Sequence, residues 1–174
     1  MKSSVNTIKE LRDITCASIA HCKKALEDTK GDIKQAAILL RKQGLEIAAK
    51  KQARSAKEGR VDAYIHHSNK MGVLLEVNCE SDFVARNEEF ARFTKDLAMQ
   101  IAATSPAYIK KEDVPPELLQ HEKSKEDYYK NNCLLEQVFV KDPGMTIKDY
   151  LGSVVAKIGE NIVIRRFIRY KIGE

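Results

Sequence analysis

Apolar residues at helical spacing dominate the first 44 positions of the chain. Three runs with a period of three or four residues predict three helices: Ile8, Leu11 and Ile14; Ile19, Cys22, Ala25 and Leu26; and Ile33, Ala36, Ala37 and Leu40. Ser18 and Asp32 precede the second and third runs as N-cap residues, and Gly31 and Gly44 are expected to end these helices. The pattern predicts a small three-helix bundle.

The hydrophobic pattern changes to a strand period at Gly59. Residues 61–65 alternate between apolar and polar side chains, residues 68–72 are turn-forming types, and residues 73–79 return as the second strand of a hairpin. A final alternating stretch at residues 162–170 predicts another strand. The second part of the chain therefore contains a small antiparallel sheet.

Three helices are expected between the hairpin and the last strand. The first follows Asn87 as its N-cap, the second is a polar helix that contains Leu118 and runs to about Lys130, and the third lies between Thr146 and Gly159. Together these elements predict an α+β protein.

Two domains are expected. Residues 1–52 form a three-helix domain and the start of a basic connecting helix over residues 45–58. Residues 53–174 form an α+β core with a small antiparallel sheet and helices.

The net charge of +5 is unevenly distributed along the chain. Residues 1–57 hold 13 Lys and Arg against 6 Asp and Glu, whereas residues 58–174 are nearly neutral. A basic segment indicates an acidic or polyanionic partner, although solvated lysines on a small helical domain explain it at least as well. The basic segment contains no Phe, Tyr or Trp for base stacking, so we expect no sequence-specific binding of nucleic acid.

Composition also indicates the cellular compartment of the protein. No apolar run approaches the ~20 residues of a membrane helix, and residues 1–4 do not begin a signal or transit sequence. The four cysteines are widely spaced and are expected to be reduced thiols: Cys16, Cys22, Cys79 and Cys133. These features predict a cytoplasmic protein that does not associate with a membrane.

Signals for catalysis are weak. The chain has no Gly-rich phosphate loop, no Gly-x-Ser-x-Gly motif and no Cys-x-x-Cys pair, so we expect no enzyme, no cofactor and no metal site. His66 and His67 beside a turn are expected to be a solvated pair rather than metal ligands. A nucleophilic role for Cys79 with a distant histidine lacks a third orienting group.

Three stretches of the chain resemble the bacterial elongation factor Ts family. The first comprises Leu11-Arg12, Thr15, Cys22–Leu26, Gly31–Ile33 and Leu40–Gly44; the second is Leu75–Arg86; and the third is Val155–Arg166. They occur in family order, and the resemblance covers essentially the whole chain. It implies a ubiquitin-associated-like head, a dimerisation-type α+β core and a role as the exchange factor that releases GDP from elongation factor Tu.

The resemblance also implies partner-binding residues. The segment Ser81, Asp82, Phe83 and Val84 matches the family motif that reaches the GTPase near its nucleotide and dislodges Mg²⁺, with Phe83 as a wedge between helices of the partner. Ile19, Ala20 and Lys23 match the region of the head that packs on the GTPase. The competing interpretation of Phe83 is a core residue beside Phe90 and Phe93.

This chain departs from the family pattern in places. Ser81 stands where threonine is common, Cys16 and Ser18 stand where glycine is common, and Ile19-Ala20 replaces larger apolar residues. The chain has room for one core half only, as in the short members of the family, so a homodimer is expected. The alternative function is a non-catalytic adaptor whose helical head binds a protein or RNA, although this leaves the second and third stretches unexplained.

Overall fold

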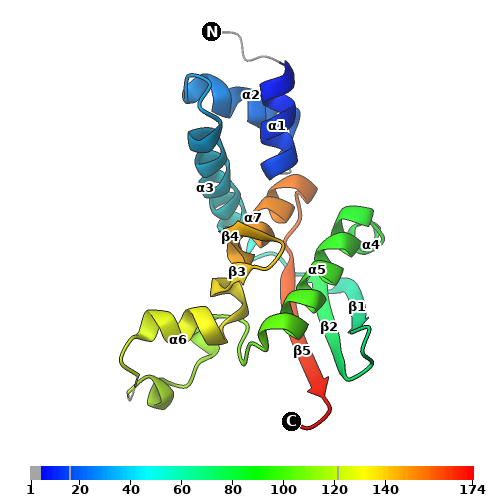
Figure 1. Ribbon diagram of the computed structural model, residues 1–174. Helices are drawn as coiled ribbons and strands as arrows, with labels where there is room; N and C mark the ends of the chain where they lie inside the picture. Colours follow the sequence, from blue (N-terminus) through cyan, green and yellow to red (C-terminus); the bar gives the residue numbers. More distant parts are fainter. Residues whose placement is uncertain (1–4, 16, 121) are drawn as a thin grey trace. The chain divides into compact units, whose positions relative to one another are not determined.

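The computed structural model describes residues 5–15, 17–120 and 122–174, and it confirms the α+β class (Figure 1). The chain divides into two compact units. The helical unit comprises Met1–Arg54 and Leu151–Asn161, and the sheet unit comprises Ser55–Tyr150 and Ile162–Glu174. That residues 1–52 and 53–174 are separate domains stays a prediction.

Three helices form the start of the helical unit: α1 (Val5–Thr15), α2 (Ile19–Asp28) and α3 (Ile33–Lys51). The predicted caps are present, because the Ser18 side chain accepts a hydrogen bond from the His21 N–H and Asp32 accepts one from the Gln35 N–H. The core contains the predicted apolar positions: Leu11, Cys22, Ala25, Leu26, Ala36, Ala37 and Leu40. Cys16 lies outside the described residues.

Gly44 does not end a helix, contrary to the prediction. It is buried inside α3, which continues to Lys51. A Cβ at Gly44 would lie 3.2 Å from the backbone of Gly152 in α7 (Ile147–Ile158). The glycine therefore permits two helix backbones to approach closely. The connecting helix predicted over residues 45–58 is confirmed only as far as Lys51, where it forms the end of α3; residues 52–57 are not helical, and residue 58 begins a strand.

Hydrogen bonds join the segment after α7 to the end of α3 and the residues that follow it. The buried Asn161 side chain donates from Nδ2 to the Arg54 carbonyl at 2.7 Å, and Lys51 Nζ donates to the Gly159 carbonyl at 2.6 Å. Residues that are separated by 107 or 108 positions in the sequence are thus in contact within one unit.

The sheet unit is built on three antiparallel strands in the order β1–β2–β5: β1 (Glu58–Ile65), β2 (Met71–Cys79) and β5 (Val163–Lys171). Helix α5 (Glu88–Thr104) contacts β1 and β2 and buries Phe90, Phe93, Leu97 and Ile101 (Figure 1). The predicted hairpin, the Asn87 cap and the final strand are confirmed.

Residues 105–146 contain the larger departures from prediction. Two 3₁₀ helices (Lys111–Asp113 and Pro116–Leu119) precede α6 (Lys125–Asn132), so the single helix expected from Leu118 to Lys130 is wrong. A third 3₁₀ helix (Leu134–Glu136) and a hairpin of β3 (Val138–Phe139) and β4 (Asp142–Thr146) follow. The sequence pattern did not predict this hairpin.

A buried carboxylate anchors this region to α5. Asp96 accepts a hydrogen bond from the Tyr150 hydroxyl at 2.9 Å and pairs with Lys141 Nζ at 2.6 Å. The Tyr150 ring also packs between Phe93 and Phe139. The buried charge is thus both paired and hydrogen-bonded, as burial of a carboxylate requires.

Candidate functional site

The candidate site lies between β2 and α5. The segment between them contains a one-turn helix, α4 (Asp82–Ala85). The Ser81 hydroxyl caps it by accepting the Val84 N–H, and the Asn87 side chain accepts the Glu89 N–H at 2.8 Å to cap α5. Two N-caps within seven residues therefore hold the backbone around position 83.

Phe83 projects into solvent with 84 % of its surface exposed, the largest fraction of any large apolar side chain in the described ranges. Phe90 and Phe93 are fully buried. The interpretation of Phe83 as a member of that core is therefore wrong. An aromatic side chain that is this exposed to solvent is typical of an interface anchor.

The other three predicted residues of the motif lie around Phe83 in different roles. Ser81 and Val84 are joined by the capping hydrogen bond. Asp82 is half exposed and pairs with Arg86, with 3.2 Å between Oδ2 and Nη2. Arg86 was not among the predicted site residues, although its position four residues after Asp82 is a sequence signal for this ion pair.

The start of α4 is linked to the core through Cys79. This thiol is fully buried at the end of β2 and donates to the Ser81 carbonyl at 3.1 Å. Cys79 is thus inaccessible in the folded chain, which argues against the nucleophilic role considered from sequence.

The predicted head residues lie on the surface of α2. Ile19 is 58 % exposed, Ala20 is exposed, and Lys23 pairs loosely with Glu27 at 4.0 Å. Ile19 and Lys23 are one helical turn apart and so share a face. They belong to the helical unit, whereas Phe83 belongs to the sheet unit.

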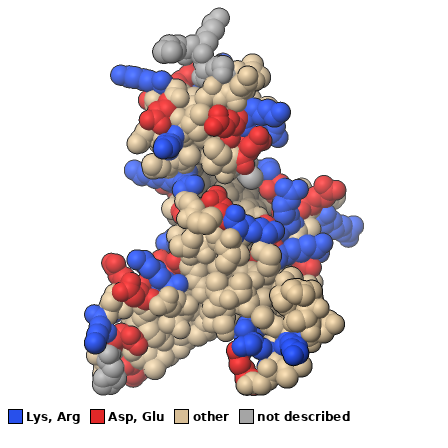
Figure 2. All heavy atoms as spheres, viewed as in Figure 1, with Lys and Arg blue, Asp and Glu red and all other residues tan. Residues whose placement is uncertain are grey.

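Charges on the helical unit do not form a single-sign patch on the visible face. Figure 2 shows Lys and Arg side chains interspersed with Asp and Glu over these helices. The excess of basic residues in the first 57 positions therefore gives a mixed surface on this side.

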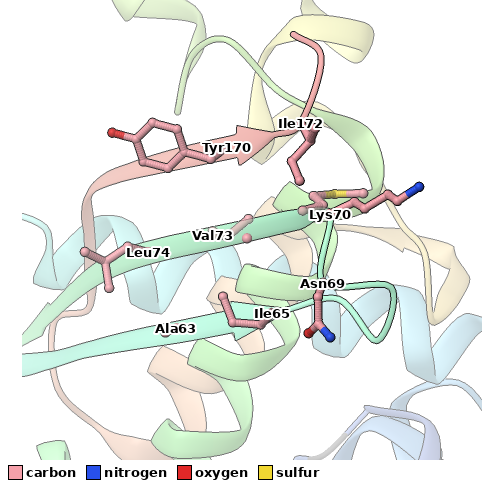
Figure 3. Close-up of a pocket in the computed structure, with 10 residues that line it drawn as sticks. Ala63, Ile65, Asn69, Lys70, Val73, Leu74, Tyr170 and Ile172 are labelled. Carbon is pink, nitrogen blue, oxygen red and sulfur yellow. The ribbon is translucent and has the colours of Figure 1, made fainter.

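A second exposed surface lies on the three-stranded sheet, and the sequence analysis did not identify it. One face of the sheet is open and largely apolar, with the Glu76–Arg166 ion pair beside Val61, and we call its apolar part the open sheet face: Val61, Ala63, Ile65, Leu74, Ile168, Tyr170 and Ile172. Ala63, Leu74 and Ile168 are cross-strand neighbours. A concavity of about 360 Å³ lies at its hairpin end, between Ile65 and Tyr170 (Figure 3).

A sequence signal for the open sheet face does exist. Antiparallel sheets with one solvated face normally carry polar residues there, but in β1 the outward positions Val61, Ala63 and Ile65 are apolar. Such a patch is typical of an interaction surface.

Across residues 5–15, 17–120 and 122–174, no three His, Cys, Asp or Glu side chains gather as a metal site would require. His66 Nδ1 lies 2.9 Å from the Ser68 hydroxyl, and its ring packs against His67. No helix in the described part of the chain is long and apolar enough to cross a membrane.

A family model and the similar proteins of known name agree on one family. The family model described as Elongation factor TS matches residues 2–127 and 124–174. The chain is 49 % identical to Elongation factor Ts of Caldanaerobacter subterraneus subsp. tengcongensis, over 98 % of this chain and 97 % of the relative. It is 46 % identical to Elongation factor Ts of Geobacter sulfurreducens, over 100 % of this chain and 91 % of the relative.

The fold and the site define a two-unit α+β protein that presents an exposed aromatic side chain on a capped turn. The chain belongs to the elongation factor Ts family, and its role is that of a translation elongation factor.

Proposed function

We propose that this chain is the guanine nucleotide exchange factor for elongation factor Tu, acting in the cytoplasm without a cofactor and without covalent chemistry. It binds the GDP-bound GTPase, dislodges Mg²⁺ and promotes release of GDP so that GTP can bind. The observation that carries the proposal is the 84 % exposure of Phe83 on α4, beside Asp82 in the family motif.

The physical requirement on an exchange factor is differential affinity. It must bind the nucleotide-free GTPase more tightly than the GDP-bound form, because a ligand shifts an equilibrium only by that difference. A pocket for Phe83 that is complete only after helices of the partner have moved supplies such a difference. Burying a Phe side chain contributes ~1.5–3 kcal/mol, which corresponds to one or two decades in rate at ~1.4 kcal/mol per decade.

The remaining affinity comes from a wider interface. Ile19, Ala20 and Lys23 on α2 form a second contact with the GTPase, and their exposure supports this role. Linking two contacts in one chain raises the overall affinity, because the second contact forms at a high effective concentration.

Release of a fluorescent GDP analogue from purified elongation factor Tu tests the proposal. Substoichiometric amounts of this chain should accelerate release, and the isolated chain should hydrolyse no nucleotide. An unchanged release rate would contradict the proposal and would leave the adaptor function, and nucleotide hydrolysis by the isolated chain would contradict the absence of covalent chemistry.

We also propose that the chain is a homodimer that pairs through the open sheet face. Covering the exposed Leu74, Ile168 and Tyr170 removes apolar surface from water. A second copy presents the same apolar patch, and identical patches pair about a two-fold axis.

Sedimentation analysis tests the homodimer. The wild-type chain should sediment at twice its mass of 19.7 kDa, and Leu74→Asp should return it to the monomer. Leu118→Asp is the matched control, because Leu118 is similarly exposed but lies outside the sheet. A wild-type monomer at micromolar concentration contradicts the proposal.

A further inference from the structure

Arg86 forms an ion pair at the surface, beside the α4 turn. Its side chain is 82 % accessible, and it lies three residues after Phe83, so the two share one face of the α4 turn. Its ion pair with Asp82 joins Nη2 to Oδ2 at 3.2 Å. A guanidinium carries five N–H donors, so several remain directed to solvent beside Phe83.

The fold itself gains little from Arg86. An ion pair between exposed side chains four residues apart contributes at most a small amount to stability. The Ser81 cap and the Cys79 thiol hold α4 without it. The guanidinium is therefore available for a contact outside the isolated chain without cost to the fold.

We infer that Arg86 is a specificity-determining contact that binds a carboxylate side chain of the GTPase at the edge of the Phe83 pocket; this inference rests on the proposed exchange function. The ion pair with Asp82 restrains one side of the guanidinium. Its other side is thereby oriented toward a planar acceptor that can accept two hydrogen bonds. Arginine is suited to this role because its fork matches a carboxylate, and it is enriched among interface residues that carry binding energy.

A carboxylate of the protein fits the thermodynamics better than a phosphate of the nucleotide. A contact with GDP would stabilise the GDP-bound GTPase and would oppose release. A contact with a side chain of the GTPase is available in the nucleotide-free form as well. Arg86 therefore binds an acceptor that remains after GDP has left.

The test compares Arg86→Ala with Arg92→Ala, which removes an equally charged, exposed side chain from α5. Arg86→Ala should raise the half-saturating concentration of GTPase in the GDP-release assay about tenfold, and it should weaken binding to the nucleotide-free GTPase to a similar extent. Arg86→Lys should lie between Arg86→Ala and the wild type, and Arg92→Ala should match the wild type. Thermal unfolding of all three variants should be unchanged.

A double-mutant cycle separates direct contact from mere positioning of Asp82. In an Asp82→Ala background, Arg86→Ala should still weaken binding if the guanidinium contacts the partner, although by less than tenfold, because Asp82 no longer orients the side chain. No further loss there, an effect equal to that of Arg92→Ala, or weaker binding confined to the GDP-bound form would each overturn the inference. Failure of the wild-type chain to bind or stimulate the GTPase would instead reject the proposed function.

Discussion

Phe83 can be removed with little effect on the fold, because most of its surface already faces water. We expect Phe83→Ala to lower stimulated GDP release more than tenfold, since truncating an interface anchor costs ~2 kcal/mol or more. Its melting temperature should stay close to that of the wild type. GDP release and thermal unfolding measured on the same preparation check both statements.

Phe90→Ala is the matched control for that experiment. Phe90 is fully buried, so its truncation should cost ~3–5 kcal/mol of stability. A Phe83→Ala protein that is unstable but fully active would exclude the wedge role.

Two thiols should resist modification in the native state. Burial raises the pKa of Cys22 and the pKa of Cys133, and a raised pKa leaves less of the reactive thiolate at a given pH. We expect both to remain unmodified by iodoacetamide at pH 8 and to react fully in denaturant, as measured by peptide mass spectrometry. Rapid native labelling of either residue would show that its surroundings open.

Residues whose role is local were predictable from sequence. Ser18, Asp32 and Asn87 cap helices because each side chain bonds to a backbone N–H two or three residues away. The ion pair of Arg86 is local as well and could have been found by its spacing. The exposure of Phe83 could be argued only from its position, because burial depends on distant parts of the chain.

At the scale of elements, Gly44 shows why local rules can mislead. Glycine commonly follows the end of a helix, but the contact that explains Gly44 is with Gly152, 108 positions later. Similarly, the hairpin of β3 and β4 has two- and five-residue strands, one of which contains Pro143 and Gly144. Such short strands carry too few alternating positions for a strand pattern.

The contact between α3 and α7 predicts a destabilising substitution. Gly44→Val should lower the free energy of unfolding by ~1–3 kcal/mol, because the added side chain meets backbone at 3.2 Å and has no space to enter. Ala49→Val, at an exposed position of the same helix, controls for the lower helix propensity of valine. Thermal or denaturant unfolding gives the comparison, and equal losses for the two variants would contradict the role of Gly44.

At the scale of the whole molecule, the two units are connected by three passages of the chain: at residues 54–55, 150–151 and 161–162. The sequence predicted the α+β class correctly, because the spacing of apolar residues identifies each helix or strand from its own residues alone. It could not predict that residues 151–161 join the first helices. That association depends on Gly152 and Asn161, whose partners lie more than 100 positions away.

Cutting the backbone near the exposed Arg54 and Lys57 should therefore not release the first helices. The C-terminal piece still carries the half of α7 that packs on α3, and Asn161 still holds the Arg54 carbonyl. A chain nicked there by trypsin should show two bands on a denaturing gel and a single peak in gel filtration. The first helices therefore cannot be exchanged by themselves. A chimaera that replaces residues 1–54 must replace residues 151–161 as well.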